Sequence, residues 1–557
     1  MPCGPGLLCV PAWRTPSSPS GSWSPCVTGS TNPRHPPSPP TPKPERPLLN
    51  CVIDKPLVPS FPRRNHPTHM NSTPASLRPV RHRRTLFTTT RLLGLSTVAA
   101  LSCLPASTYY WTGTSGDWTT STTSLVWSTT STGSPSTYWT NANAADIVTS
   151  NAPIHLWNVS ATTVTIENGA SLYASGSGAT STTRGLTVTQ GGSGDFSLTD
   201  QRTSGTSLNL KVLLTGSTAW NGTITVNGST VSTVSLTIAS QTGTGVNSVG
   251  VNTKVHLASG GNLEIGPGII GNVATIGELS GNGNIKFPGQ FSTTGGTRTL
   301  RVEQSTNTTF SGTIGENLTR TDHVLAFTKA GTGILSISGT GGYEGATTVE
   351  GGKLFLNGTY GSGFTGVTGQ GDYVVKNGAL LGVNGTITLS TGSTARNVTI
   401  ESGGTLKPGT ADAVGTMTIS GGNASSKGLV FLGQATIEFR LGTAQDMITL
   451  TSASMTGSAL GGNGSVVFDL LGSSGPTIGT TYDLISFGGT SQGIALGTFA
   501  LSSATQSAGW AGTFSYGGDG NLLQFTVTAV PEPGTVALAA LGLCAAIGFI
   551  RRKAASA

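Results

Sequence analysis

Short runs in which apolar and polar residues alternate recur along the chain from about residue 162 to residue 530. Three of them lie close together at 333–337, 346–349 and 353–356, and glycine-rich turns separate them. Alternation indicates strands that bury one face, and glycine adopts the positive φ that tight turns require. The pattern therefore predicts many short strands joined by turns rather than helices.

Comparable strands return at intervals of roughly 20–30 residues, which is the spacing of solenoid repeats. Eight Asn-Gly pairs between residues 168 and 464 mark tight turns. At ~22 residues per turn, residues 107–530 would make ~19 turns spaced ~4.8 Å apart. We expect an all-β fold, a right-handed parallel β-helix or solenoid over 107–428. Its inward Val, Ile and Leu residues, Leu335 and Leu354 among them, should stack into one continuous core.

The strands become longer after residue 428. Runs such as 436–441, 466–471 and 482–487 alternate over six residues instead of three or four. Longer alternating strands are typical of an ordinary sheet with one buried face. The change predicts a terminal β-module over 429–529 that caps the stack.

One stretch, residues 325–358, follows a stricter pattern of glycine, apolar and polar positions. Its fixed positions are Thr328, Lys329, Gly331, Gly333, Leu335, Ile337, Ser338, Gly339, Tyr343, Gly345, Thr347, Val349, Gly352, Leu354, Leu356, Asn357 and Gly358. This series resembles the autotransporter-associated β-strand repeat. The resemblance implies a bacterial exported or surface protein, possessing the β-helical fold that the strand pattern predicts.

The first 106 residues differ in composition from the rest. They contain 21 of the 29 prolines, and residues 1–69 lack periodic apolar positions, which predicts a disordered extension or a mistaken start upstream of Met70. Residues 70–106 combine five arginines, a short apolar run at 92–101 and a small residue at Ala106. That order predicts a secretory signal peptide.

Charge and cysteine usage narrow the function of the remainder. Residues 1–106 carry a net charge of +10 and residues 107–557 a net charge of −3, so the overall +7 does not indicate nucleic-acid binding. Residues 107–530 contain no cysteine, which excludes disulfides and thiolate zinc sites there.

Five of the nine tryptophans fall between residues 109 and 157. Flat aromatic faces can stack on sugar rings, so a carbohydrate-binding platform is one interpretation. The other interpretation, which we favour, is a hydrophobic cap that closes the first turn of the solenoid and protects its strand edge.

The C-terminal tail, residues 530–557, has three features in order. Pro531, Glu532 and Pro533 come first, and the apolar run 535–550 follows. The basic residues Arg551, Arg552 and Lys553 come directly after that run. Sixteen apolar residues form a helix of ~24 Å, long enough for a transmembrane helix with slight thinning of the bilayer. This order resembles the PEP-CTERM sorting signal. The resemblance implies that an exosortase, a membrane protease-transpeptidase, recognises Pro531, Glu532 and Pro533.

No cluster of catalytic or ligating residues stands out in the body. Its histidines, His155, His256 and His323, are far apart, and its carboxylates are scattered. We therefore expect no enzyme activity, no cofactor and no metal site. The expected function is an exported structural or adhesin-like protein of the cell surface or extracellular matrix. The alternative is a β-helix that binds or degrades polysaccharide, since turns of the coil could still bring two carboxylates together.

Overall fold

The computed structural model describes residues 107–531 apart from short gaps. The described ranges are 107–113, 116–148, 152–174, 183–201, 209–215, 219–239, 248–266, 273–287, 296–315, 323–361, 369–451, 460–471, 476–487 and 494–531. All of them belong to the second of two compact units, residues 99–557. The predicted extension at 1–69 and the predicted signal peptide at 70–106 lie outside the described residues.

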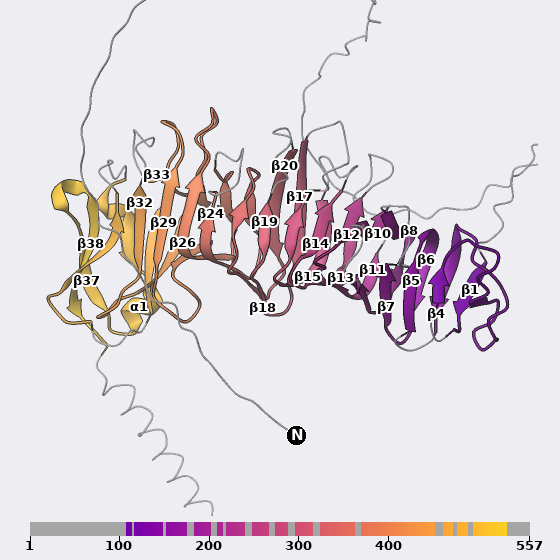
Figure 1. Cartoon of the computed structure of the whole chain (residues 1–557). Helices are drawn as coiled ribbons and strands as arrows, with labels where there is room; N and C mark the ends of the chain where they lie inside the picture. The colour runs from indigo at the N-terminus through magenta and orange to yellow at the C-terminus, as the bar shows by residue number, and fades with distance from the viewer. Residues whose placement is uncertain are drawn as a thin grey trace, which may run out of the picture. The chain divides into compact units, whose positions relative to one another are not determined.

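The first third of the described chain is built from strands that pair in parallel, mostly with the strand two places later, except that Trp127–Ser128 pairs antiparallel with the first strand (Figure 1). These strands are β1 (Thr108–Trp111), β2 (Gly116–Trp118), β3 (Trp127–Ser128), β4 (Asn143–Ile147), β5 (Ala152–Leu156), β6 (Asn158–Ile166), β7 (Ala170–Ala174), β8 (Thr183–Ser193), β9 (Phe196–Thr199), β10 (Asn209–Thr215), β11 (Trp220–Val226), β12 (Thr233–Ala239), β13 (Ser248–Leu257) and β14 (Gly261–Ile265). Such pairing means that each turn of the chain lies on the previous turn.

The middle third continues the parallel pairing, now with the strand two or three places later. Its strands are β15 (Val273–Gly281), β16 (Asn284–Lys286), β17 (Gly296–Glu303), β18 (Thr308–Phe310), β19 (Thr313–Gly315), β20 (His323–Ala330), β21 (Ile334–Ile337), β22 (Gly341–Gly342), β23 (Thr347–Val349), β24 (Lys353–Tyr360), β25 (Tyr373–Val375), β26 (Leu380–Leu389), β27 (Val398–Ile400), β28 (Thr405–Pro408) and β29 (Thr416–Gly421). The predicted β-solenoid is confirmed.

The last third contains the change of pairing that ends the coil. Its elements are β30 (Leu429–Phe431), β31 (Gln434–Arg440), β32 (Met447–Thr451), β33 (Leu460–Gly462), β34 (Ser465–Leu471), β35 (Thr481–Ser486), the 3₁₀ turn η1 (Leu496–Thr498), β36 (Phe499–Leu501), helix α1 (Ser503–Ser507), β37 (Ala511–Gly517), the 3₁₀ turn η2 (Gly518–Gly520) and β38 (Leu522–Ala529). Parallel pairing persists through β34 and β36, whereas β38 pairs antiparallel with both β35 and β37. The antiparallel pairing therefore begins later than residue 429, and the strands from β30 onward are no longer than earlier strands such as β8 and β13.

Most turns use more residues than the ~22 assumed from repeat spacing, although a few, such as the one from Leu335 to Leu354, use fewer. Leu354 pairs with Leu381, 27 residues later, and Leu406 pairs with Ile437, 31 residues later. Most strand pairs show offsets above the ~22 residues assumed from repeat spacing. The stack consequently has fewer turns than the ~19 expected. The hand of the coil stays a prediction.

The core is one column of apolar side chains that continues from turn to turn. Paired strands align a row of six residues, each fully buried: Leu335, Leu354, Leu381, Leu406, Ile437 and Phe468. Burying one such side chain stabilises the fold by roughly 1.5–3 kcal/mol. The register assigned to Leu335 and Leu354 from the alternation pattern is confirmed.

Tryptophans close the first turn of the stack. Trp111, Trp118, Trp127 and Trp139 are fully buried. Their rings pack edge-to-face or tilted at centroid distances of 4.8–5.2 Å, a favourable arrangement for aromatic rings. Since none of the four offers an open face, they form a hydrophobic cap and not a sugar-stacking platform. Trp157 differs, because 36% of its surface is exposed.

Candidate functional site

The strongest site signal of the sequence begins where the last strand ends. Ala529, the final residue of β38, pairs with Ala511 at the start of β37. Val530 packs, partly buried, against the core. A side chain at Gly509 would lie 3.4 Å from the Cα atom of Pro531. The first proline of the predicted sorting motif thus lies beside Gly509 of the folded body.

The other predicted site residues lie outside the described part of the chain. These are Glu532 and Pro533 of the motif, the apolar run 535–550, and the basic residues Arg551, Arg552 and Lys553. Within the described residues, none of the helices has the length and apolar character needed to cross a bilayer. The proposed roles of these tail residues therefore rest on the sequence.

The fold and the tail together define a class of protein, a β-solenoid with a C-terminal sorting region. Residues 529–553 match the family model of the PEP-CTERM protein-sorting motif. The chain thus carries this motif, which implies export, sorting at the membrane or cell surface, and processing by an exosortase. No curated protein matches the chain. The matched segment starts at Ala529, so the motif follows the folded body without a linker.

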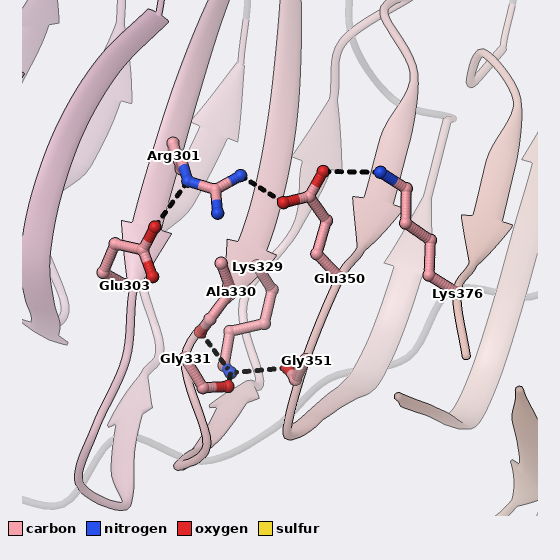
Figure 2. Close-up of polar contacts among 8 residues, drawn as sticks. All are labelled: Arg301, Glu303, Lys329, Ala330, Gly331, Glu350, Gly351 and Lys376. Carbon is pink, nitrogen blue, oxygen red and sulfur yellow. Dashed lines mark hydrogen bonds and ion pairs between the residues drawn. The ribbon is translucent and has the colours of Figure 1, made fainter. Parts of the chain in front are cut away.

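A buried lysine lies inside the stretch that resembles a known repeat (Figure 2). The ammonium of Lys329 donates hydrogen bonds to the carbonyl oxygens of Ala330, Gly331 and Gly351 at 2.7, 3.1 and 3.0 Å. The side chain is fully buried, and burial lowers its pKa to about 8, while nearby Glu303 opposes that shift. Lys329 therefore ties the turn after β20 to the turn after β23.

Glycines make this arrangement possible. Gly331 and Gly352 adopt φ values of +70° and +59°, which side-chain-bearing residues rarely adopt. The two turns can then direct their carbonyl oxygens to one point. The sequence analysis identified Lys329 only as a repeat position. Its place between an apolar run and a glycine turn was the available signal that this lysine is buried.

A row of charges crosses the stack beside Lys329 (Figure 2). Arg301 of β17 binds Glu303 at 2.6 Å and also binds Glu350. Lys376 donates to Glu350 at 2.7 Å, and this hydrogen bond is the main cause that lowers the pKa of the Glu350 carboxyl. All four side chains are 25–43% exposed. We call Arg301, Glu303, Glu350 and Lys376 the charged ladder; it links successive turns at the surface.

The titratable residues of the body do not assemble a metal site in the described part of the chain. No group of three His, Cys, Asp or Glu residues there could hold a metal ion. His155 lies 3.5 Å from Asp117, and His256 shares a hydrogen bond of 3.0 Å with Ser280. The side chain of His323 is outside the described residues. The expected absence of catalytic and cofactor-binding residues stays a prediction.

Proposed function

We propose that this chain is an exported, non-enzymatic structural or adhesin-like protein. An exosortase would process its tail near Pro531–Pro533, and the solenoid would then be displayed at the cell surface or in the extracellular matrix. The observation that carries this proposal is the sorting motif at residues 529–553, which begins at the last residue of the folded body.

The architecture supports this proposal. Both ends of the described stack are covered, one by the tryptophan cap and the other by antiparallel strands, which disfavours end-to-end pairing of solenoids through bare turns. A solenoid with covered ends and no cysteine in residues 107–530 is suited to serve as an extracellular scaffold. A right-handed coil, which parallel crossovers strongly prefer, is part of this proposal. The assignment of residues 325–358 as an autotransporter-associated β-strand repeat, which rests on resemblance, is also part of this proposal.

Mass spectrometry of both termini, on protein isolated from its own host, tests the proposal. We expect a chain that starts near Ser107 and ends near Pro531–Pro533. A chain that retains Arg551–Lys553 would contradict sorting by cleavage and would make the tail a permanent anchor.

The rival function is binding or degradation of polysaccharide. Incubation of the processed protein with a panel of polysaccharides separates the two, because turnover of any of them would contradict a structural role. Saturable binding without turnover agrees with an adhesin.

A further inference from the structure

The outward face of the sheet formed by β6, β8 and β10 has a hollow that one glycine creates. Asn158, Gly185 and Lys211 pair side by side on these three strands. The next residues along each strand include the buried Val159 and Leu186, so the row with Gly185 faces outward. Gly185 has no side chain, which leaves a gap between Asn158 and Lys211.

A cavity of about 360 Å³ lies at this gap, within the size range of small-molecule sites. Its polar lining residues are Asn141, Asn158, Ser160, Arg184, Thr187 and Lys211. Val159, Leu186 and Leu213 complete the wall with apolar atoms. Amides and hydroxyls beside an apolar surface match the chemistry of a sugar ring, which carries hydroxyl groups around apolar faces.

The charges of the lining residues are all of one sign. Arg184 and Lys211 are cationic, and no lining residue is acidic. Lys211 lies 2.9 Å from Glu264, whose two carboxylate oxygens also accept hydrogen bonds from Ser235 and Thr237. Glu264 thus fixes the position of the Lys211 ammonium, which has three donor hydrogens.

An aromatic side chain holds the second cation. The guanidinium carbon of Arg184 stands 4.2 Å from the ring centroid of Trp157, the residue that precedes Asn158. This distance is typical of a cation–π contact. Arg184 of β8 is 2% exposed, whereas Trp157, which directly precedes β6, is partly exposed. Arg184 alternates with Gly185 along β8 and pairs with the buried Leu210, so its side chain lies on the inward side. Lys211, fixed by Glu264, is therefore the cation of the outward wall.

We propose that this hollow binds an acidic sugar unit of an extracellular polysaccharide. Lys211 would receive the carboxylate, Asn141, Asn158, Ser160 and Thr187 the hydroxyls, and Leu213 an apolar face of the ring. The inference names a ligand class for the proposed surface protein and rests on that function for its biological setting. It requires no covalent step and no cofactor.

Titration calorimetry of the full chain in detergent tests the inference with two probes, a galacturonic acid trimer and the neutral galactose trimer. We expect saturable binding of the acidic trimer and binding of the neutral trimer that is at least about tenfold weaker. Lys211→Met should weaken the acidic trimer about tenfold or more. Lys254→Met is the matched control, since Lys254 also binds a carboxylate, Glu278 at 3.1 Å, but lies outside the cavity.

A second variant guards against misfolding of the first. Asn158 is exposed, so Asn158→Ala should leave the melting temperature unchanged and still weaken the acidic trimer about threefold or more. No binding of the acidic trimer would overturn the inference, as would equal binding of both trimers or unchanged binding by both variants. These outcomes are independent of sorting, because a processed chain that binds neither trimer refutes only the hollow. A chain that binds the acidic trimer and keeps its tail refutes only the sorting.

Discussion

Two turns of the solenoid each bury a lysine, but the hydrogen bonding of the two ammonium groups differs. Lys329 of β20 is surrounded by three carbonyl oxygens within hydrogen-bonding distance. Lys407 of β28 is 2% exposed, and its ammonium has no hydrogen-bond partner among the described residues. Its nearest carboxylate, Glu438, is 3.8 Å away. Burial lowers the pKa of both lysines, but only the Lys329 ammonium forms hydrogen bonds that offset the loss of contact with water.

The difference arises from the local backbone. Lys329 lies beside two glycine turns whose carbonyls converge on it. Lys407 pairs with Gly382, which in turn pairs with Phe355. A side chain at Gly382 would overlap the Phe355 ring at 2.2 Å, so that ring covers the space beside Lys407. The comparison shows that burial of a charge does not by itself reveal a stabilising role; the acceptors around it decide that.

The largest effect should come from breaking the apolar column that both turns share. Leu354→Asp places a carboxyl in the fully buried row and should reduce the free energy of unfolding by about 4 kcal/mol or more. Urea unfolding followed by tryptophan fluorescence measures it. Leu432→Asp is the control, because Leu432 is 40% exposed and its change should stay within about 1 kcal/mol. A Leu354→Asp protein as stable as the parent would mean that the strand register is wrong.

Lys329→Met is the next largest change. It keeps the aliphatic stem and removes the donor from three carbonyl oxygens, so it should destabilise the protein by about 1–3 kcal/mol at pH 7. The same urea assay applies. We call the carbonyl oxygens of Ala330, Gly331 and Gly351 around Lys329 the carbonyl cage. If Lys329→Met left the urea midpoint of unfolding unchanged, the carbonyl cage would not contribute to stability.

Lys407→Met should behave in the opposite way. The variant removes a poorly bonded buried charge, and Glu438 retains contact with water because 23% of its side chain is exposed. We expect stability that is unchanged or increased by about 1 kcal/mol. A loss comparable to that of Lys329→Met would show that the 3.8 Å ion pair with Glu438 is stabilising, and would remove the contrast between the two turns.

The pH dependence of stability sharpens the contrast further. Because the pKa of Lys329 is about 8 in the folded protein and 10.5 in the unfolded chain, the unfolded chain holds more protons between these values. Stability of the parent should therefore rise relative to Lys329→Met from pH 8 to 10. Thermal melts at pH 7, 8, 9 and 10 test this. A parent-minus-variant difference that stays flat would place the pKa of Lys329 near its ordinary value.

The smallest effect is expected at the charged ladder. Glu350→Gln removes two ion pairs, but both lie at the surface, so the loss should not exceed about 1 kcal/mol and should shrink in 1 M salt. The lowered pKa of Glu350 adds stability above pH 4.5 that disappears as the pH falls through the folded-state pKa. Melts of parent and variant should therefore converge in acid; a persistent gap would contradict this.

Sequence patterns predicted the parts of the fold that depend on one residue at a time. Alternation identified Leu335 and Leu354 as buried, and glycine identified turns such as the one at Gly331. Features that require two turns to meet were not predictable. The carbonyl cage of Lys329 and the hollow at Gly185 both depend on which residues become paired 20 to 30 positions apart. The terminal β-module over 429–529 stays a prediction, and strand length in the sequence did not reveal that parallel pairing continues as far as β36.

At the sorting site, the sequence specified Pro531, Glu532 and Pro533, and the structure added where the first of them is held. Its β38 strand ends at Ala529, and the predicted membrane helix starts at residue 535. Only five residues connect them, a tether of at most ~18 Å when fully extended. If the predicted helix spans the bilayer, the folded body would stay within about 18 Å of the hydrocarbon core before cleavage. The residues Pro531–Pro533 would then lie between the folded body and the bilayer. A membrane-embedded sorting enzyme could reach them there more easily than a large soluble protease.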